Sequence, residues 1–179
     1  MSTYHHGDLR ASVLAAAGEL VEKEGLAGLS VREAARRAGV SHNAPYRHFP
    51  DRDALLAALA TEGFTDLGKA LENRSGRELG EAYVRFALAN PQRFRLMFGG
   101  QLELDRYPEL RAQAEATHGR LTAAFAPLGA EAKFAAAAAW SLVHGLAQLI
   151  LDGHLENDEG FVTKVIGAIR FAAGPQRSA

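Results

Sequence analysis

The chain of 179 residues contains no cysteine. This absence excludes disulfide bonds, thiolate nucleophiles and cysteine-ligated metal sites, and it says nothing about the compartment. Long apolar runs are also missing. The longest candidate, around residues 135–151, is interrupted by Trp140, Ser141, His144 and Gly145. We therefore expect no segment that crosses a membrane.

An excess of charge of either sign is lacking too. The formal net charge is −1 and the sequence pI is about 6.7. Nothing in the overall composition indicates a nucleic-acid partner, so any affinity for DNA has to come from a local patch. The N-terminal residues YHHGDLR lack the basic and then apolar run of a secretion signal. We therefore expect a cytoplasmic protein.

The sequence shows neither the residue pattern of β-strands nor a set of residues typical of a catalytic site. There is no sustained alternation of apolar and polar residues, and helical periods dominate instead, so we predict an all-α fold with about nine helices. A helical enzyme would need a nucleophile, a metal cluster or convergent carboxylates, and the sequence offers none. His5 and His6 lack the third ligand that a metal site would need. We expect them to belong to an N-terminal tail, and such a tail could also reach DNA. We predict no cofactor, no metal and no enzymatic activity.

The most informative stretch is residues 30–52, SVREAARRAGVSHNAPYRHFPDR. Ser30 and Glu33 have the spacing of a capping box, and small apolar residues follow at helical intervals. Gly39 then stands where a helix often ends in a left-handed residue. Two short helices joined by such a turn, with small residues where they cross, are typical of a helix-turn-helix.

The second helix of this motif contains a local conflict. If Ser41 caps the helix, Pro45 falls at the fourth helical position, where its ring crowds a carbonyl and it lacks an N–H group. Either the helix starts irregularly, or Asn43 is the cap and the helix begins at about Ala44. Both alternatives leave Asn43 near the exposed N-terminal end, where recognition helices contact bases.

The charge of residues 30–52 supports the same interpretation. Five arginines oppose Glu33 and Asp51, which gives a local charge of plus three. A basic patch of this kind is also compatible with an ordinary solvated face. The glycine turn, the small crossing residues and the polar second helix favour DNA binding over that alternative.

The remaining sequence predicts further helices. An amphipathic helix is predicted over 8–23, and it completes a three-helix domain that covers residues 1–52. A helix over 51–71 connects this domain to a second one, 72–179, for which we predict effector binding and dimerisation. The turn signals lie at 71–75. The other predicted helices cover 75–89, 90–98, 108–125, 132–151 and a last segment from 157 that includes Ile169 and Phe171.

The first fifty or so residues resemble the DNA-binding domain of the TetR family of transcriptional regulators. The resemblance rests on LSVREAARRAGVS and APYRHFPDRDALL, although Pro45 replaces a larger apolar residue. It implies that the helix from Ser41 to Arg47 enters the major groove and that Tyr46 and Arg52 contact phosphates. The residues that we predict to contact DNA are Ser30, Arg32, Ser41, His42, Asn43, Tyr46, Arg47, His48 and Arg52.

The second half resembles a C-terminal domain of that family that is named for a Trp, a His and a Gly, through FALANPQRFRLMF and AWSLVHGLAQLIL. Trp140, His144 and Gln148 lie four residues apart on one helix face. They indicate either a ligand pocket or a hydrogen-bonded core histidine with ordinary aromatic packing. The residues that we predict to line an effector pocket are Phe94, Met97, Phe98, Phe125, Trp140, His144 and Gln148.

The last two helices carry apolar residues on more than one face. An intrachain core is one explanation, but we favour a homodimer through a four-helix interface, and the family resemblance agrees. The leading hypothesis is a dimeric repressor that binds a pseudo-palindromic operator and is released by a small apolar or aromatic effector. The alternative is a constitutive DNA-binding regulator without an effector.

Overall fold

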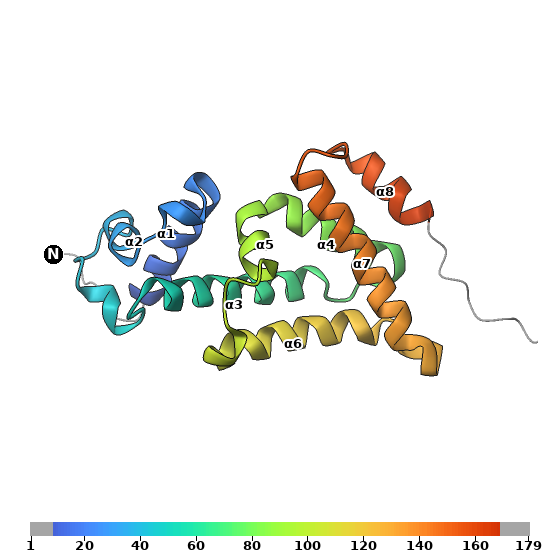
Figure 1. Cartoon of the computed structure of the whole chain (residues 1–179), viewed down its shortest axis with the longest axis horizontal. Helices are drawn as coiled ribbons and strands as arrows, with labels where there is room; N and C mark the ends of the chain where they lie inside the picture. Colours follow the sequence, from blue (N-terminus) through green and yellow to red (C-terminus); the bar gives the residue numbers. More distant parts are fainter. Residues whose placement is uncertain (1–8, 169–179) are drawn as a thin grey trace, which may run out of the picture. The chain divides into compact units, whose positions relative to one another are not determined.

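The computed structural model describes residues 9–168, and all regular structure in that range is helical, as the sequence predicts (Figure 1). The eight α-helices are α1 (Leu9–Glu24), α2 (Val31–Arg37), α3 (Arg52–Ala70), α4 (Gly76–Ala89), α5 (Pro91–Phe98), α6 (Pro108–Ala123), α7 (Ala132–Leu151) and α8 (Glu159–Ala168). The short 3₁₀ helices are η1 (Leu26–Gly28), η2 (Ala44–Arg47), η3 (Leu104–Arg106) and η4 (Ala126–Glu131). The predicted ninth helix is η2. His5, His6, Ile169 and Phe171 lie outside the described residues.

The chain forms two compact units that do not follow the predicted boundary between residues 71 and 75. Among the described residues, the first unit comprises 9–64 together with 90–114. The second comprises residues 65–89 and 115–168. The continuous helices α3 and α6 therefore contribute residues to both units.

The first unit is built on α1, which packs against α2 and α5 (Figure 1). Ala34 and Ala35 are fully buried, as expected for a close helix crossing. The Glu22 carboxylate on α1 accepts hydrogen bonds from the backbone N–H groups of Gln92 and Arg93, at 3.1 and 2.9 Å. These N–H groups have no partner inside α5, so Glu22 acts as its cap. This contact fastens α5 to the helix-turn-helix.

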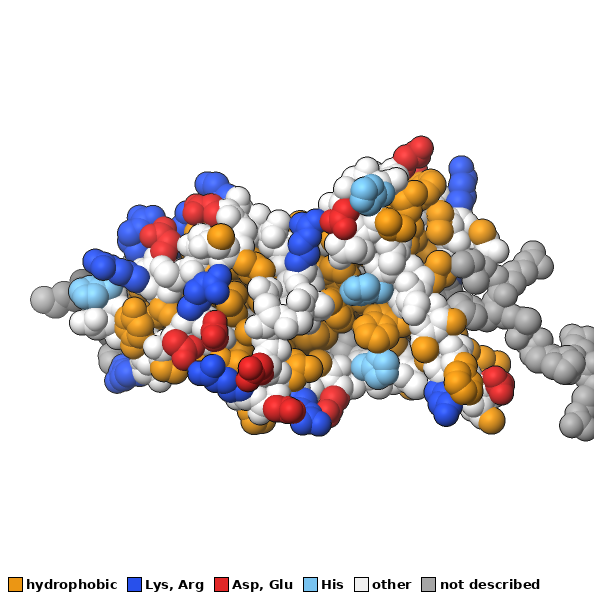
Figure 2. Space-filling view, viewed as in Figure 1, with side chains coloured by type: hydrophobic (Ala, Val, Ile, Leu, Met, Phe, Trp, Pro, Cys, Tyr) orange, Lys and Arg blue, Asp and Glu red, His pale blue; other side chains and the backbone are white. Residues whose placement is uncertain are grey.

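The second unit is built on α4, which packs against α7 and α8. One side of α7 is buried, through Ala136, Val143, Leu146, Ala147 and Ile150. On its other side Phe134 is 60% exposed and Leu149 is 45% exposed. Hydrophobic side chains are visible on the surface of this helix in Figure 2. The second unit therefore leaves a partly apolar helix face open.

The stretch Ala126–Leu151 is more continuous in the structure than the sequence analysis expected. It is 26 residues long and, by length and composition alone, apolar enough to cross a membrane. The buried side of α7 instead packs on α4, and α7 is the core helix of the second unit.

Candidate DNA-binding surface and ligand cavity

The start of α2 shows which cations of the basic patch are already paired. Ser30 Oγ accepts a hydrogen bond from the backbone N–H of Glu33, at 3.1 Å, and so caps the helix as predicted. The Glu33 carboxylate accepts from Arg36 Nη2 at 2.7 Å and from Arg37 Nε at 3.2 Å. These hydrogen bonds, first from Arg36 and then from Arg37, lower the pKa of Glu33 to about 2. Half of the capping box is therefore formed. Of the five arginines in residues 30–52, Arg36 and Arg37 are paired with carboxylates, and Arg37 also pairs with Glu24.

The end of α2 has the predicted glycine turn. Gly39 adopts a left-handed φ of 68°. Its N–H donates to the Arg36 carbonyl at 3.2 Å, and the Val40 N–H donates to the Ala35 carbonyl at 3.1 Å. This pair of bonds is a Schellman motif, which satisfies the last carbonyls of the helix.

The recognition segment differs from the predicted helix. Residues 44–47 form the 3₁₀ helix η2, and neither Ser41 nor Asn43 caps it through its side chain. The N–H groups of His48 and Phe49 both donate to the Pro45 carbonyl, at 2.8 Å each. Pro45 itself is buried. The helix begins at Ala44, as one of the two alternatives proposed, because proline is accommodated in the first helical turn and not beyond it.

The polar side chains of this segment point outward while Pro45 and Phe49 are buried. The exposed residues are Ser41, His42, Asn43, Tyr46, Arg47 and His48. Ser30, Arg32, Ser41 and His42 line one shallow groove together with Arg36. Figure 2 shows Lys and Arg side chains gathered around this part of the first unit. The structure therefore brings four of the nine residues that we predict to contact DNA, Ser30, Arg32, Ser41 and His42, into one groove.

Arg52 has a structural role that the sequence did not reveal. Its guanidinium donates from Nε to the Leu29 carbonyl, at 3.0 Å, and from Nη2 to the Leu26 carbonyl, at 2.6 Å. Both carbonyls lie in the segment that leads into α2. Arg52 therefore ties the start of α3 to the start of the helix-turn-helix, and its predicted phosphate contact stays a prediction.

Asp51 is a second residue at this junction that the sequence analysis did not assign. Its carboxylate accepts from the backbone N–H of Ala54 at 2.7 Å, which caps α3. The Arg106 guanidinium lies 3.5 Å from the same carboxylate. The sequence offered the N-cap spacing as a signal, but nothing local pointed to Arg106.

The second unit contains a cavity of about 410 Å³. It is lined by Gly76, Arg77, Leu79, Gly80, Tyr83, Leu121, Phe125, Ala136, Ala139, Trp140, Leu142, Val143, Ile166 and Gly167. A volume of this size is within the usual range for small-molecule sites. Of the seven predicted pocket residues, Phe125 and Trp140 line this cavity.

The other five predicted pocket residues lie elsewhere. Phe94 and Phe98 contact each other in the first unit as a tilted pair with ring centroids 4.9 Å apart, and Phe64 meets Phe98 edge to face at 5.4 Å. Met97 fills the space beside Gly63, where an added Cβ would lie 2.6 Å from its sulfur. These side chains form core. In the second unit, Gln148 donates to the Asp152 carboxylate at 2.9 Å, and neither Gln148 nor His144 lines the cavity.

A partly buried group of hydrogen-bonded side chains includes two of the residues that line the cavity, Tyr83 and Trp140. Trp140 Nε1 donates to the Tyr83 hydroxyl at 3.1 Å, and that hydroxyl lies 3.0 Å from His144 Nδ1. Indole is only a donor, so the Tyr83 oxygen accepts from it. Nδ1 accepts the Tyr83 proton when His144 is neutral and carries its own proton on Nε2. Burial lowers the pKa of His144, which favours the same neutral form.

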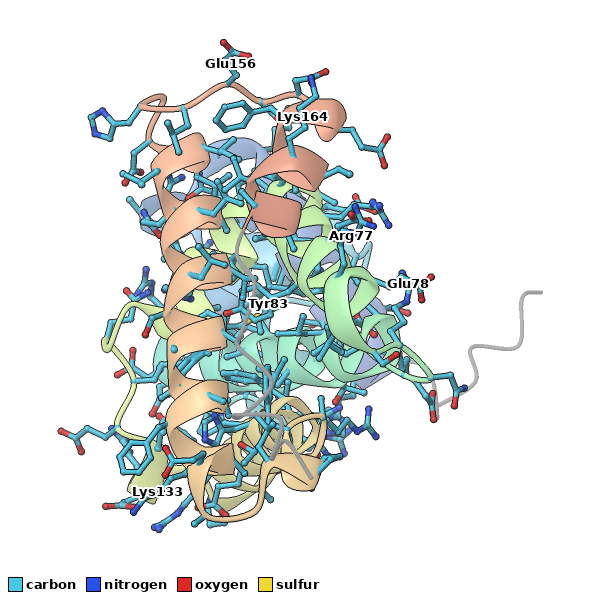
Figure 3. The ribbon with its side chains drawn as sticks, turned by 90° about the vertical axis from the view of Figure 1, so that its right-hand side faces the viewer. Arg77, Glu78, Tyr83, Lys133, Glu156 and Lys164 are labelled. Carbon is cyan, nitrogen blue, oxygen red and sulfur yellow. The ribbon has the colours of Figure 1, made fainter. Side chains whose placement is uncertain are left out.

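Burial dominates the chemistry of Tyr83 as well. The side chain is fully buried and its pKa is raised well above the ordinary value, because desolvation outweighs the Trp140 hydrogen bond. Figure 3 shows Tyr83 between α4 and α7. His118, which the sequence analysis did not single out, meets Trp140 edge to face with ring centroids 5.3 Å apart. His144 is half-buried and contacts Tyr83 at hydrogen-bond distance, and it does not line the cavity.

Comparisons with known proteins cover both halves of the chain. Among curated proteins, the HTH-type transcriptional regulator Rv1816 of Mycobacterium tuberculosis is 30% identical over 112 residues, which are 56% of this chain and 47% of that protein. The chain thus aligns with about half the length of the curated relatives it matches. A Rhodococcus sp. RHA1 protein with unknown function is 36% identical, with a TM-score of 0.80 and 94% of each chain covered.

A second solved structure is the multidrug binding protein EbrR complexed with imidazole. It is 26% identical, has a TM-score of 0.63, and is matched over 97% of this chain and 96% of its own. Residues 13–59 match the family described as bacterial regulatory proteins, tetR family, and residues 77–166 match the tetracyclin repressor-like C-terminal domain. The families and named relatives are transcriptional regulators and not enzymes. The chain belongs to the TetR family of transcriptional regulators.

Proposed function

We propose that this chain acts in the cytoplasm as a repressor that reads DNA through η2 and the turn before it. One observation carries the proposal: six consecutive or nearly consecutive polar residues between 41 and 48 are exposed around a buried Pro45. Exposed hydrogen-bonding side chains on a rigid backbone are suited to base edges in the major groove. Arg32 and Arg47, both exposed, supply the local positive charge that the net charge of −1 lacks.

A pair of substitutions tests this reading surface. Asn43→Ala is expected to relax base preference at one operator position, at a cost of roughly 1–3 kcal/mol in binding. Tyr46→Phe is expected to weaken specific and non-specific binding alike, since phosphate contacts position the protein without reading sequence. Selection of DNA sequences by the purified variants, followed by affinity measurements, separates the two effects. If the base preference of Asn43→Ala is unchanged, Asn43 is not one of the residues that contact bases.

We also propose that the active unit is a homodimer that uses the open face of α7. Phe134, Ser141 and Leu149 are exposed along this helix. An added Cβ on Gly145 would meet nothing within 4 Å, so this point can accept the close approach of a second copy of α7. Isologous pairing of two identical faces gives a two-fold axis. The operator is then a pseudo-palindrome with half-sites about one helical turn apart, or a small multiple of that.

The cavity is proposed to bind a small effector, as in a Trp-His-Gly type of C-terminal domain, with Trp140, His144 and Gly145 at the name-giving positions. A related protein, EbrR, is a multidrug binding protein solved with imidazole, which supports a ligand role for this half. The continuous helix α3 contributes residues to both units, so a ligand that favours one setting of α3 would disfavour DNA binding. Such couplings typically amount to roughly 1–3 kcal/mol, or about 5- to 150-fold in affinity.

Reciprocity provides the test of this switch. Operator DNA is expected to weaken effector binding by the same factor by which the effector weakens operator binding. The measurement is a titration of the protein with effector, in the presence and absence of operator. Equal effector affinity in both titrations would favour the constitutive regulator without a regulatory ligand.

A further inference from the structure

The cavity of the second unit has very few polar groups that a ligand could use. Among its lining residues, the polar side chains are those of Arg77, Tyr83 and Trp140. The Trp140 N–H donates to the Tyr83 oxygen, which also lies 3.0 Å from His144 Nδ1. Tyr83 and Trp140 are therefore engaged within the protein, and Arg77 is the charged side chain among the residues that line the cavity.

The position of Arg77 suits it to the mouth of the cavity. It lies in the first turn of α4, its side chain is 61% exposed, and its Nε is 4.0 Å from the Glu81 carboxylate. That distance is beyond a hydrogen bond, so the pair is a weak ion pair at the surface. Nη1 lies 3.4 Å from the point where a Cβ would stand on Gly167. The guanidinium thus reaches across to α8, beside which Figure 3 shows it.

We propose that the cavity takes a monoanionic amphiphile, with its carboxylate at the Arg77 guanidinium and its apolar body between α4, α7 and α8. This inference rests on the proposed effector function of the cavity and names the class of ligand. Guanidinium binds carboxylate through two parallel N–H···O bonds. Leu79, Leu142 and Val143 line the cavity as apolar surface for the rest of the molecule.

The charge of the mouth also discriminates among other ligands. A cationic amphiphile would place its charge beside Arg77. A neutral alcohol of the same length would bury the same apolar area but gain only a neutral hydrogen bond, which is roughly half as strong as a charge-assisted one. The structure therefore predicts an order of affinity: anion first, neutral ligand second, cation last.

A series of three probes with one alkyl chain tests this order: decanoate, decan-1-ol and decylammonium. Trp140 is the single tryptophan of the chain and lines the cavity, so its fluorescence reports binding without DNA. Titrations below the micelle concentration of each probe are expected to give decanoate an affinity roughly tenfold above that of decan-1-ol. Raised salt should weaken decanoate binding and leave decan-1-ol unchanged.

Matched variants distinguish a specific contact between the ligand and Arg77 from a general effect of positive charge. Arg77→Gln is expected to weaken decanoate roughly tenfold and to leave decan-1-ol unchanged. Arg74→Gln removes the same charge from an exposed residue three positions earlier that does not line the cavity, and it should change neither affinity. Arg77→Lys should restore part of the loss. Equal affinities for decanoate and decan-1-ol, or equal losses of both in Arg77→Gln, would overturn the proposal.

The effector function itself is measured separately, as the affinity for operator DNA with each probe present. A neutral compound that binds the cavity and releases DNA would overturn the ligand class and leave the repressor function standing. If decanoate binds through Arg77 but leaves operator affinity unchanged, the ligand class stands and the effector function fails.

Discussion

The reading segment at residues 41–48 and the wall of the cavity use polar side chains in opposite ways. In the reading segment, six polar residues are exposed while Pro45 is buried. In the cavity wall, Tyr83 is fully buried and its hydroxyl is engaged by Trp140 and His144. The first region thus keeps its hydrogen-bonding capacity available to a partner, whereas the second uses it inside the protein.

This difference shows where recognition can reside in each unit. A buried polar group must find its partner within the fold, because leaving it unpaired costs free energy. An exposed polar group has no such requirement and can exchange water for a ligand. The functions that we propose therefore rest on exposed groups: the polar residues around η2 in the first unit, and Arg77 in the second.

The largest effect is expected when a charge is introduced into the second unit, either at a buried residue of the cavity or at an exposed residue of α7. Ile166 is 9% exposed and lines the cavity, so Ile166→Glu is expected to lower the free energy of unfolding by about 3 kcal/mol or more. Leu149 is 45% exposed, so Leu149→Glu should leave the fold intact but separate the proposed dimer and abolish operator binding. Urea unfolding and sedimentation distinguish these outcomes. A stable wild-type monomer that binds its operator would contradict the dimer.

The next test makes the same substitution in the two regions. Tyr83→Phe removes the hydroxyl that Trp140 and His144 share, so we expect a loss of about 1–3 kcal/mol in stability. Tyr46→Phe changes a side chain that is 44% exposed and should leave stability unchanged while weakening DNA binding. Urea denaturation and DNA titration of both variants are the measurements. Equal stability losses would show that burial does not separate the two tyrosines.

A smaller effect is expected from Arg47, which lies in the reading segment, and from Arg52, which follows it. Arg52→Ala removes hydrogen bonds to the Leu26 and Leu29 carbonyls, so it should lower stability by about 1 kcal/mol and weaken DNA binding. Arg47→Ala removes an exposed cation and should weaken DNA binding only, with a salt slope lower by about one. If Arg52→Ala leaves the unfolding midpoint unchanged, the anchoring role is wrong.

The smallest expected effect is a dependence of stability on pH. Burial lowers the pKa of His144 in the folded protein below its ordinary value of about 6.5. The unfolded chain therefore binds a proton more readily, and stability is lost as the pH falls below about 6.5. The change should be small because the ring is only partly buried. His144→Gln should flatten this part of the pH profile, and an unchanged profile would assign it to other groups.

Local signals in the sequence were sufficient for most of the fold. The Ser30 cap and the left-handed Gly39 were identified from spacing alone, and both appear as expected. Caps and periodicity involve residues close in sequence, so their geometry is nearly independent of the rest of the chain. Pro45 was recognised as a conflict, and the structure resolves it by making η2 a short 3₁₀ helix.

The contacts that shape the candidate sites join residues far apart in sequence. Glu22 caps α5 across 70 residues, and Tyr83 reaches His144 across 61. No pattern within one helix indicates such a partner, because a glutamate on a helix surface looks the same whether or not it caps another helix. The same limit explains why Phe94 was assigned to a pocket: an aromatic residue at helical spacing is compatible with a core or with a cavity.

The shortness of η2 bears on how much DNA sequence one chain can read. Four residues in a 3₁₀ helix extend for about 8 Å, at roughly 2.0 Å of rise per residue. Successive base pairs are stacked about 3.4 Å apart, so the segment spans little more than two of them. One chain therefore carries little information through this element, and two chains at a fixed separation carry more. An inserted base pair between half-sites should then be tolerated less well than an altered base within one.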